Sequence, residues 1–100
     1  MMHIGVLQFS MAIPGAESLK DKRRVVQGLK DRLRKSFNVS VAEVDDHDVL
    51  TVATMGAVMA GSDVSYLNGA MDKILEQLRD WRDAELDDSQ LEIISPTEAG

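Results

Sequence analysis

The sequence predicts an α+β protein, a two-layer sandwich in which two helices cover one face of a four-stranded antiparallel sheet. Three observations support this prediction. Apolar residues recur at helical spacing in two segments, four shorter segments have strand character, and one polar run of four residues joins the second and third strands. The length of 100 residues predicts a single domain over residues 1–94 and a tail over residues 95–100.

Residues 3–13 are expected to form the first strand, and the proline–glycine pair that follows ends it. A helix then begins at Ser18, whose hydroxyl and the carboxylate of Asp21 have the spacing of a capping box. It continues to about residue 36, and Asn38 is expected to end it because asparagine tolerates left-handed backbone. The apolar side of this helix consists of Leu19, Val26, Leu29, Leu33 and Phe37.

Residues 39–44 alternate in polarity and predict the second strand, and residues 49–60 predict the third. Between them lies the run Asp-Asp-His-Asp at positions 45–48. A connection this short joins antiparallel neighbours, so the two strands are expected to form a hairpin. The run lacks the ligand spacing and the glycine of a calcium loop, and one histidine does not make a zinc site. We therefore expect no metal here.

A second helix is expected after the capping pair Ser62-Asp63, with Trp81 near its end and the pair Asp87-Asp88 as its breaker. Gly69 inside this helix predicts close packing at that position. Residues 90–94 predict the last strand. The order βαββαβ, with right-handed crossovers, is that of the ferredoxin-like fold, with both helices on one face and sheet order 4-1-3-2.

Several segments resemble the YlxP-like family, small bacterial proteins grouped as domain of unknown function 503. These are residues 4–7 (IGVL), 18–26 (SLKDKRRVV) and 37–44 (FNVSVAEV), and the resemblance covers nearly the whole chain. It implies a ferredoxin-like fold, no established enzymatic activity, and genes that often lie among translation and ribosome-maturation genes. Relatives commonly carry an aromatic residue, Gln and Arg where this chain has Leu50, Thr51 and Val52.

The composition is that of a soluble globular protein, with 44% hydrophobic and 28% charged residues and no cysteine. No apolar run approaches the roughly 20 residues of a membrane-spanning helix. We therefore expect a cytoplasmic protein without membrane contact. The net charge of −6 argues against general nucleic-acid binding, and no DNA specificity is expected.

The charge is unevenly distributed. Residues 17–37 contain eight basic and three acidic residues, a net charge of +5, whereas the rest of the chain has a net charge of −11. At about 100° per residue, one flank of the first helix carries Lys20, Arg23, Lys30 and Arg34, while Arg24 points outward. Such a strip suits an RNA phosphate backbone or a ribosomal particle. The alternatives are docking of an acidic protein partner and a solvated helix face without function.

Lys22 falls within the apolar sector of the first helix, and Glu43 interrupts an otherwise apolar strand. The sequence favours a structural ion pair between them. The rival interpretation is a small enzyme that uses Lys22, Glu43 and an aspartate of the hairpin turn. No nucleophile motif, phosphate-binding loop or dinucleotide fingerprint is present, so we expect neither enzymatic activity nor a cofactor.

Both alternating faces of the first and third strands are substantially apolar, so one apolar set is expected to remain uncovered by the helices. Uncovered apolar patches of this kind usually mark interfaces. The sequence therefore predicts a homo-oligomer, a symmetric dimer through the open sheet face or an edge strand. The candidate interface residues are Ile4, Val6, Leu50, Val52 and Val58.

Overall fold

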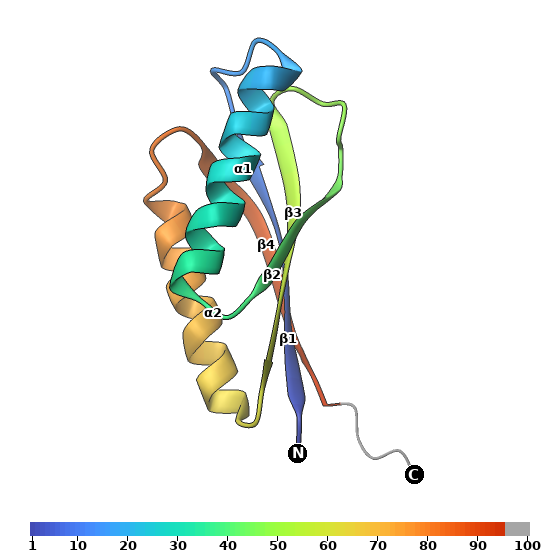
Figure 1. Cartoon of the computed structure of the whole chain (residues 1–100), viewed down its shortest axis with the longest axis vertical. Helices are drawn as coiled ribbons and strands as arrows, with labels where there is room; N and C mark the ends of the chain where they lie inside the picture. Colours follow the sequence, from blue (N-terminus) through green and yellow to red (C-terminus); the bar gives the residue numbers. More distant parts are fainter. Residues whose placement is uncertain (96–100) are drawn as a thin grey trace.

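In the computed structural model, which describes residues 1–95, a four-stranded antiparallel sheet is covered on one face by two helices (Figure 1). The elements are β1 (His3–Ala12), α1 (Leu19–Ser36), β2 (Ser40–Asp45), β3 (Val52–Gly61), α2 (Val64–Arg79) and β4 (Glu85–Ile94). The strands lie in the order β2-β3-β1-β4, which confirms the predicted fold. Of the expected tail, residues 96–100 lie outside the described residues.

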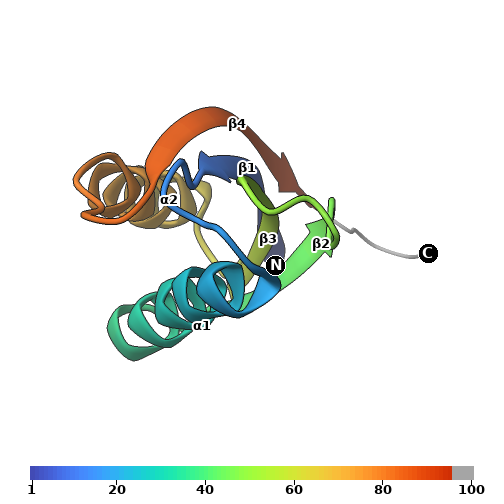
Figure 2. The ribbon, with the colours of Figure 1, turned by 90° about the horizontal axis from the view of Figure 1, so that it is seen from above.

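The core lies between the sheet and the helices, and Figure 2 shows both helices on the same side of the curved sheet. Residues paired across antiparallel strands share a face. Leu7 and Phe9 of β1 pair with Ala57 and Met55 of β3, and all four are at most 1% exposed. The even-numbered residues of β1 and β3 consequently lie on the opposite face, which no helix covers; we call it the open face.

Side-chain caps begin both helices, as the sequence predicts. The Ser18 hydroxyl accepts the N–H of Asp21 at 3.1 Å, and the Asp21 carboxylate accepts the N–H of Glu17 at 3.0 Å. Asp63 caps α2 through the N–H of Ser65. The predicted left-handed exit at Asn38 is wrong. α1 ends at Ser36, and its C-cap Phe37 has extended backbone and donates its N–H to the carbonyl oxygen of Leu33.

The last strand begins earlier than predicted, at Glu85 instead of residue 90, and α2 ends at Arg79. The Asp87-Asp88 pair lies within β4. Ser10 pairs with Asp88 and Met11 with Leu86, so Asp87 is the extra residue of a bulge. Because β4 is an edge strand, these carboxylates stay in solvent. Aspartates are therefore compatible with a strand here, whereas in the core they would destabilise it.

Two further expectations are wrong. β3 begins at Val52 and not at residue 49, because carbonyl groups of the preceding loop turn toward a side chain of α1 instead of pairing with β2. Gly69 does not mark close packing, since a Cβ atom added there would meet nothing within 4 Å.

Candidate functional site

One flank of α1 faces β2, and we call it the β2-side flank. It carries four basic side chains. The guanidinium group of Arg34 fixes its direction, because Nη2 donates to the carbonyl oxygen of Val41 on β2 at 3.2 Å. Helical rotation places the other three on the same side of α1. Three of the four are exposed and Lys30 is half-buried. The set is Lys20, Arg23, Lys30 and Arg34.

The β2-side flank has no carboxylate partner among residues 1–95. There, the one ion pair with a nitrogen–oxygen distance of 4.0 Å or less joins Lys22 and Glu43. Asp31, which follows Lys30 in the sequence, instead accepts a hydrogen bond from Gln27 at 2.8 Å. The structure therefore favours a free cationic surface over a helix face neutralised by its own acidic groups.

Arg24 is separate from the β2-side flank. It is exposed on the outer side of α1 and lines a shallow hollow that also contains Asp21 and Asp83. These two acidic groups reduce the local positive charge, so Arg24 is a weaker candidate for anion contact than the other four.

The pair Lys22–Glu43 forms in the structure. Lys22 is 2% exposed, and its Nζ lies 2.9 Å from Oε2 of Glu43. The same nitrogen donates to the carbonyl oxygens of Asp46, His47 and Val49 at 2.6, 3.3 and 2.8 Å. Since an ammonium group has three N–H donors, the carbonyls use all of them, and Glu43 is held by charge rather than by a directed hydrogen bond.

This arrangement makes Lys22 the anchor of the loop between β2 and β3. Asp46 adopts left-handed backbone (φ 55°), which aspartate tolerates better than most residues. The ammonium group contacts one carboxylate and three carbonyl oxygens, and the residue is 2% exposed. Among the described residues no three acidic or histidine side chains come together as metal ligands.

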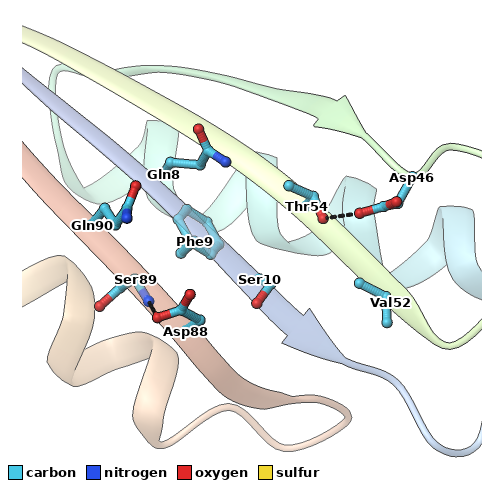
Figure 3. Close-up of a pocket in the computed structure, with 9 residues that line it drawn as sticks. All are labelled: Gln8, Phe9, Ser10, Asp46, Val52, Thr54, Asp88, Ser89 and Gln90. Atoms are coloured by element: carbon cyan, nitrogen blue, oxygen red, sulfur yellow. Dashed lines mark hydrogen bonds between the residues drawn. The ribbon is translucent and has the colours of Figure 1, made fainter.

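A polar hollow of about 270 Å³ lies on the open face, next to the anchored loop (Figure 3). The hydroxyl of Thr54 donates to Oδ2 of Asp46 at 2.7 Å, which closes one side of the hollow. Asp88 stands on the other side and accepts the N–H of Ser89. Sequence reasoning missed this hollow, although the polar residues Gln8 and Ser10 at even positions of β1 were a signal. Its lining is Gln8, Phe9, Ser10, Asp46, Val52, Thr54, Asp88, Ser89 and Gln90.

The open face is therefore polar near the loop, and at its other end apolar residues of β1 and β3 are flanked by Glu92 of β4 and Ser40 of β2. Ile4 and Val6 lie on it, paired with β3 residues that include Val58, which is 44% exposed. Val52 also belongs to this face but lines the polar hollow. The placement of Leu50 on the third strand is wrong, since this residue lies in the loop before β3, and its role in an interface stays a prediction.

The dimer stays a prediction, and its candidate interface on the open face is the end around Ile4, Val6 and Val58. A symmetric pair should show a light-scattering mass twice that of the 11.0 kDa chain at micromolar concentration. Val58→Lys should then return the mass to that of one chain, because it places a charge in the centre of the contact. A wild-type mass of one chain would contradict this prediction.

Sequence reasoning also missed a contact between α1 and the loop that follows α2. The guanidinium carbon of Arg32 lies 5.5 Å from the ring centroid of Trp81, a cation–π distance. Helical rotation puts Arg32 on the side of α1 away from the β2-side flank, and the sequence predicts Trp81 near the end of the second helix. Nothing in that pattern indicates that the two side chains meet.

One of two comparisons with known proteins finds a match. A family model described as "Protein of unknown function (DUF503)" matches residues 4–91, which include every helix and most of every strand. No curated protein matches the chain. Neither helix within residues 1–95 is long and apolar enough to cross a membrane. The family match agrees with the resemblance seen in the sequence, and the chain belongs to the DUF503 family.

Proposed function

We propose that this protein is a non-enzymatic RNA-binding protein that contacts phosphates through the β2-side flank of α1. One observation supports the proposal above all: Lys20, Arg23, Lys30 and Arg34 follow one side of the helix without a carboxylate partner in the described part of the chain. Unpaired cations in a row are free to exchange their counterions for phosphates.

The negative charge of the rest of the chain restricts the side from which RNA approaches. Outside residues 17–37 the chain has a net charge of −11, which repels a polyanion. RNA is thus expected to approach only along α1. A helix flank that offers charges alone contacts the backbone without reading bases. The open face, where other sheet proteins stack RNA bases, has no aromatic side chain exposed in its polar hollow, since Phe9 is 1% exposed.

We further propose that the natural ligand is a structured RNA or a ribosomal particle in the cytoplasm, in line with the gene neighbourhood that the family resemblance implies. The second candidate is an acidic protein partner on the same flank. The enzymatic alternative through Lys22 and Glu43 is disfavoured by the burial of Lys22.

Salt dependence separates RNA from an acidic protein. We expect a labelled 20-nucleotide single-stranded RNA of mixed sequence to bind at 50 mM salt. Four phosphate contacts with a single strand predict that the affinity falls roughly 50-fold between 50 and 200 mM. Fluorescence anisotropy of the labelled RNA measures both affinities. Absence of binding at 50 mM would overturn the RNA proposal and leave the acidic protein partner.

A further inference from the structure

A second hollow lies between α1 and the loop that follows α2, on the side of α1 opposite to the β2-side flank. Its volume is about 440 Å³, within the range of small-molecule sites. An added Cβ atom at Gly28 would come within 4.0 Å of Trp81, so the indole ring lies against α1 where that helix has no side chain. The lining residues are Arg32, Gln77, Asp80, Trp81, Arg82 and Asp83.

The chemistry of this hollow suits a flat, uncharged ring. Trp81 is partly exposed, and the guanidinium group of Arg32 lies over its ring. Aromatic rings and guanidinium planes are the surfaces on which proteins stack unpaired RNA bases. Two arginines and two aspartates line the hollow, so its formal charges balance, and a phosphate gains little there.

One polar atom of the hollow lacks a partner. Oε1 of Gln77 is buried and accepts no hydrogen bond. A buried acceptor without a donor is unfavourable, and such an atom calls for an explanation. The edge of a nucleobase carries both N–H donors and acceptors. It satisfies this oxygen only when the Gln77 side chain turns toward the hollow, because the oxygen itself has almost no accessible surface.

We propose that this hollow is a stacking site for one unpaired nucleobase, which packs on the Trp81–Arg32 pair beside Gln77. The inference extends the proposed function, because the same RNA that lies on the β2-side flank crosses α1 to reach the hollow. A helix with its side chains is about 10–12 Å wide, a width that a short single strand spans. The site accepts any base, since every base has a π-face.

Trp81 is the one tryptophan of the chain, so tryptophan fluorescence, excited selectively over that of Tyr66, reports on this site. The experiment compares a 12-nucleotide single-stranded RNA with an abasic strand of the same length, at 50 mM salt. Anisotropy of a strand label measures affinity, and tryptophan emission measures stacking. We expect both strands to bind, and only the strand with bases to quench Trp81. We expect the strand with bases to bind with an affinity about 5- to 150-fold higher than that of the abasic strand.

Two variants separate stacking from a purely structural role of the ring. Trp81→Phe keeps an aromatic face and should retain most of the advantage of the strand with bases. Trp81→Leu keeps an apolar side chain against the core and should bind both strands equally. Circular dichroism should show that each variant folds.

The outcomes distinguish this inference from the proposed function. Equal affinities of wild type for the two strands, with unchanged tryptophan emission, would overturn the stacking site while the phosphate contact stands. Binding and quenching by the strand with bases alone would support the stacking site and overturn the phosphate contact. If neither strand binds, both proposals are wrong.

Discussion

Lys22→Met is expected to lower the free energy of unfolding by about 3–5 kcal/mol, the cost of breaking a buried ion pair by removing one partner. Methionine fills similar space but donates no hydrogen bond. The carbonyls of Asp46, His47 and Val49 would lose their donor, and the carboxylate of Glu43 would lose its counter-charge. Equilibrium unfolding in urea, followed by circular dichroism, measures the loss.

Two companion variants show whether the carbonyl contacts or the ion pair dominate. Glu43→Gln leaves the ammonium group bonded to all three carbonyls, so we expect a smaller loss of about 1–3 kcal/mol. The double variant Lys22→Met/Glu43→Leu should recover part of the loss, because no buried charge remains unpaired. If the free energy of unfolding of Lys22→Met lay within about 1 kcal/mol of the wild-type value, this would contradict the anchoring role of Lys22.

Reversing two charges of the β2-side flank is expected to weaken RNA binding at 50 mM salt by at least roughly 60-fold, since it removes half of four counterion-releasing contacts. Lys20→Glu/Arg23→Glu is the variant of choice. Both side chains are exposed, whereas Arg34 is bonded to β2 and its loss would also disturb the fold. Anisotropy of the labelled RNA gives the two affinities.

The matched control is Lys73→Glu/Arg79→Glu, which makes the same change in net charge on exposed positions of α2. It should weaken binding far less, because these residues lie outside the proposed contact. The free energy of unfolding of each double variant should differ from that of wild type by no more than about 0.5 kcal/mol per substitution. Equal weakening by the two variants would mean that net charge alone, and not the flank, governs binding.

The element order could be predicted because each helix has both an apolar stripe and a side-chain cap. The strand boundaries could not. Asp87 breaks a helix or a buried strand, yet it fits β4, where the bulge and the sheet edge leave its side chain in solvent. The start of β3 depends on carbonyl groups that turn to Lys22, a tertiary contact that no local pattern contains.

The candidate sites also divide into those that local sequence patterns predict and those that depend on tertiary contacts. The β2-side flank follows from helical rotation, and Lys22–Glu43 follows from two charges at apolar positions, so both could be read from local periodicity. The Trp81–Arg32 contact joins side chains 49 positions apart in the sequence, and only the packing of α1 against the end of α2 brings them together. The open face was expected to be an apolar surface, but its polar end depends on where the loop places Asp46.

The most direct test of phosphate contact by the β2-side flank is the slope of the logarithm of RNA affinity against the logarithm of salt concentration. Neutral variants suit this measurement, because each lost contact removes about 0.7 from the slope for a single strand. Lys20→Gln/Arg23→Gln should reduce the magnitude of the slope by about 1.4 relative to wild type, while Lys73→Gln/Arg79→Gln leaves it unchanged. A slope that stays at the wild-type value in Lys20→Gln/Arg23→Gln would contradict the account.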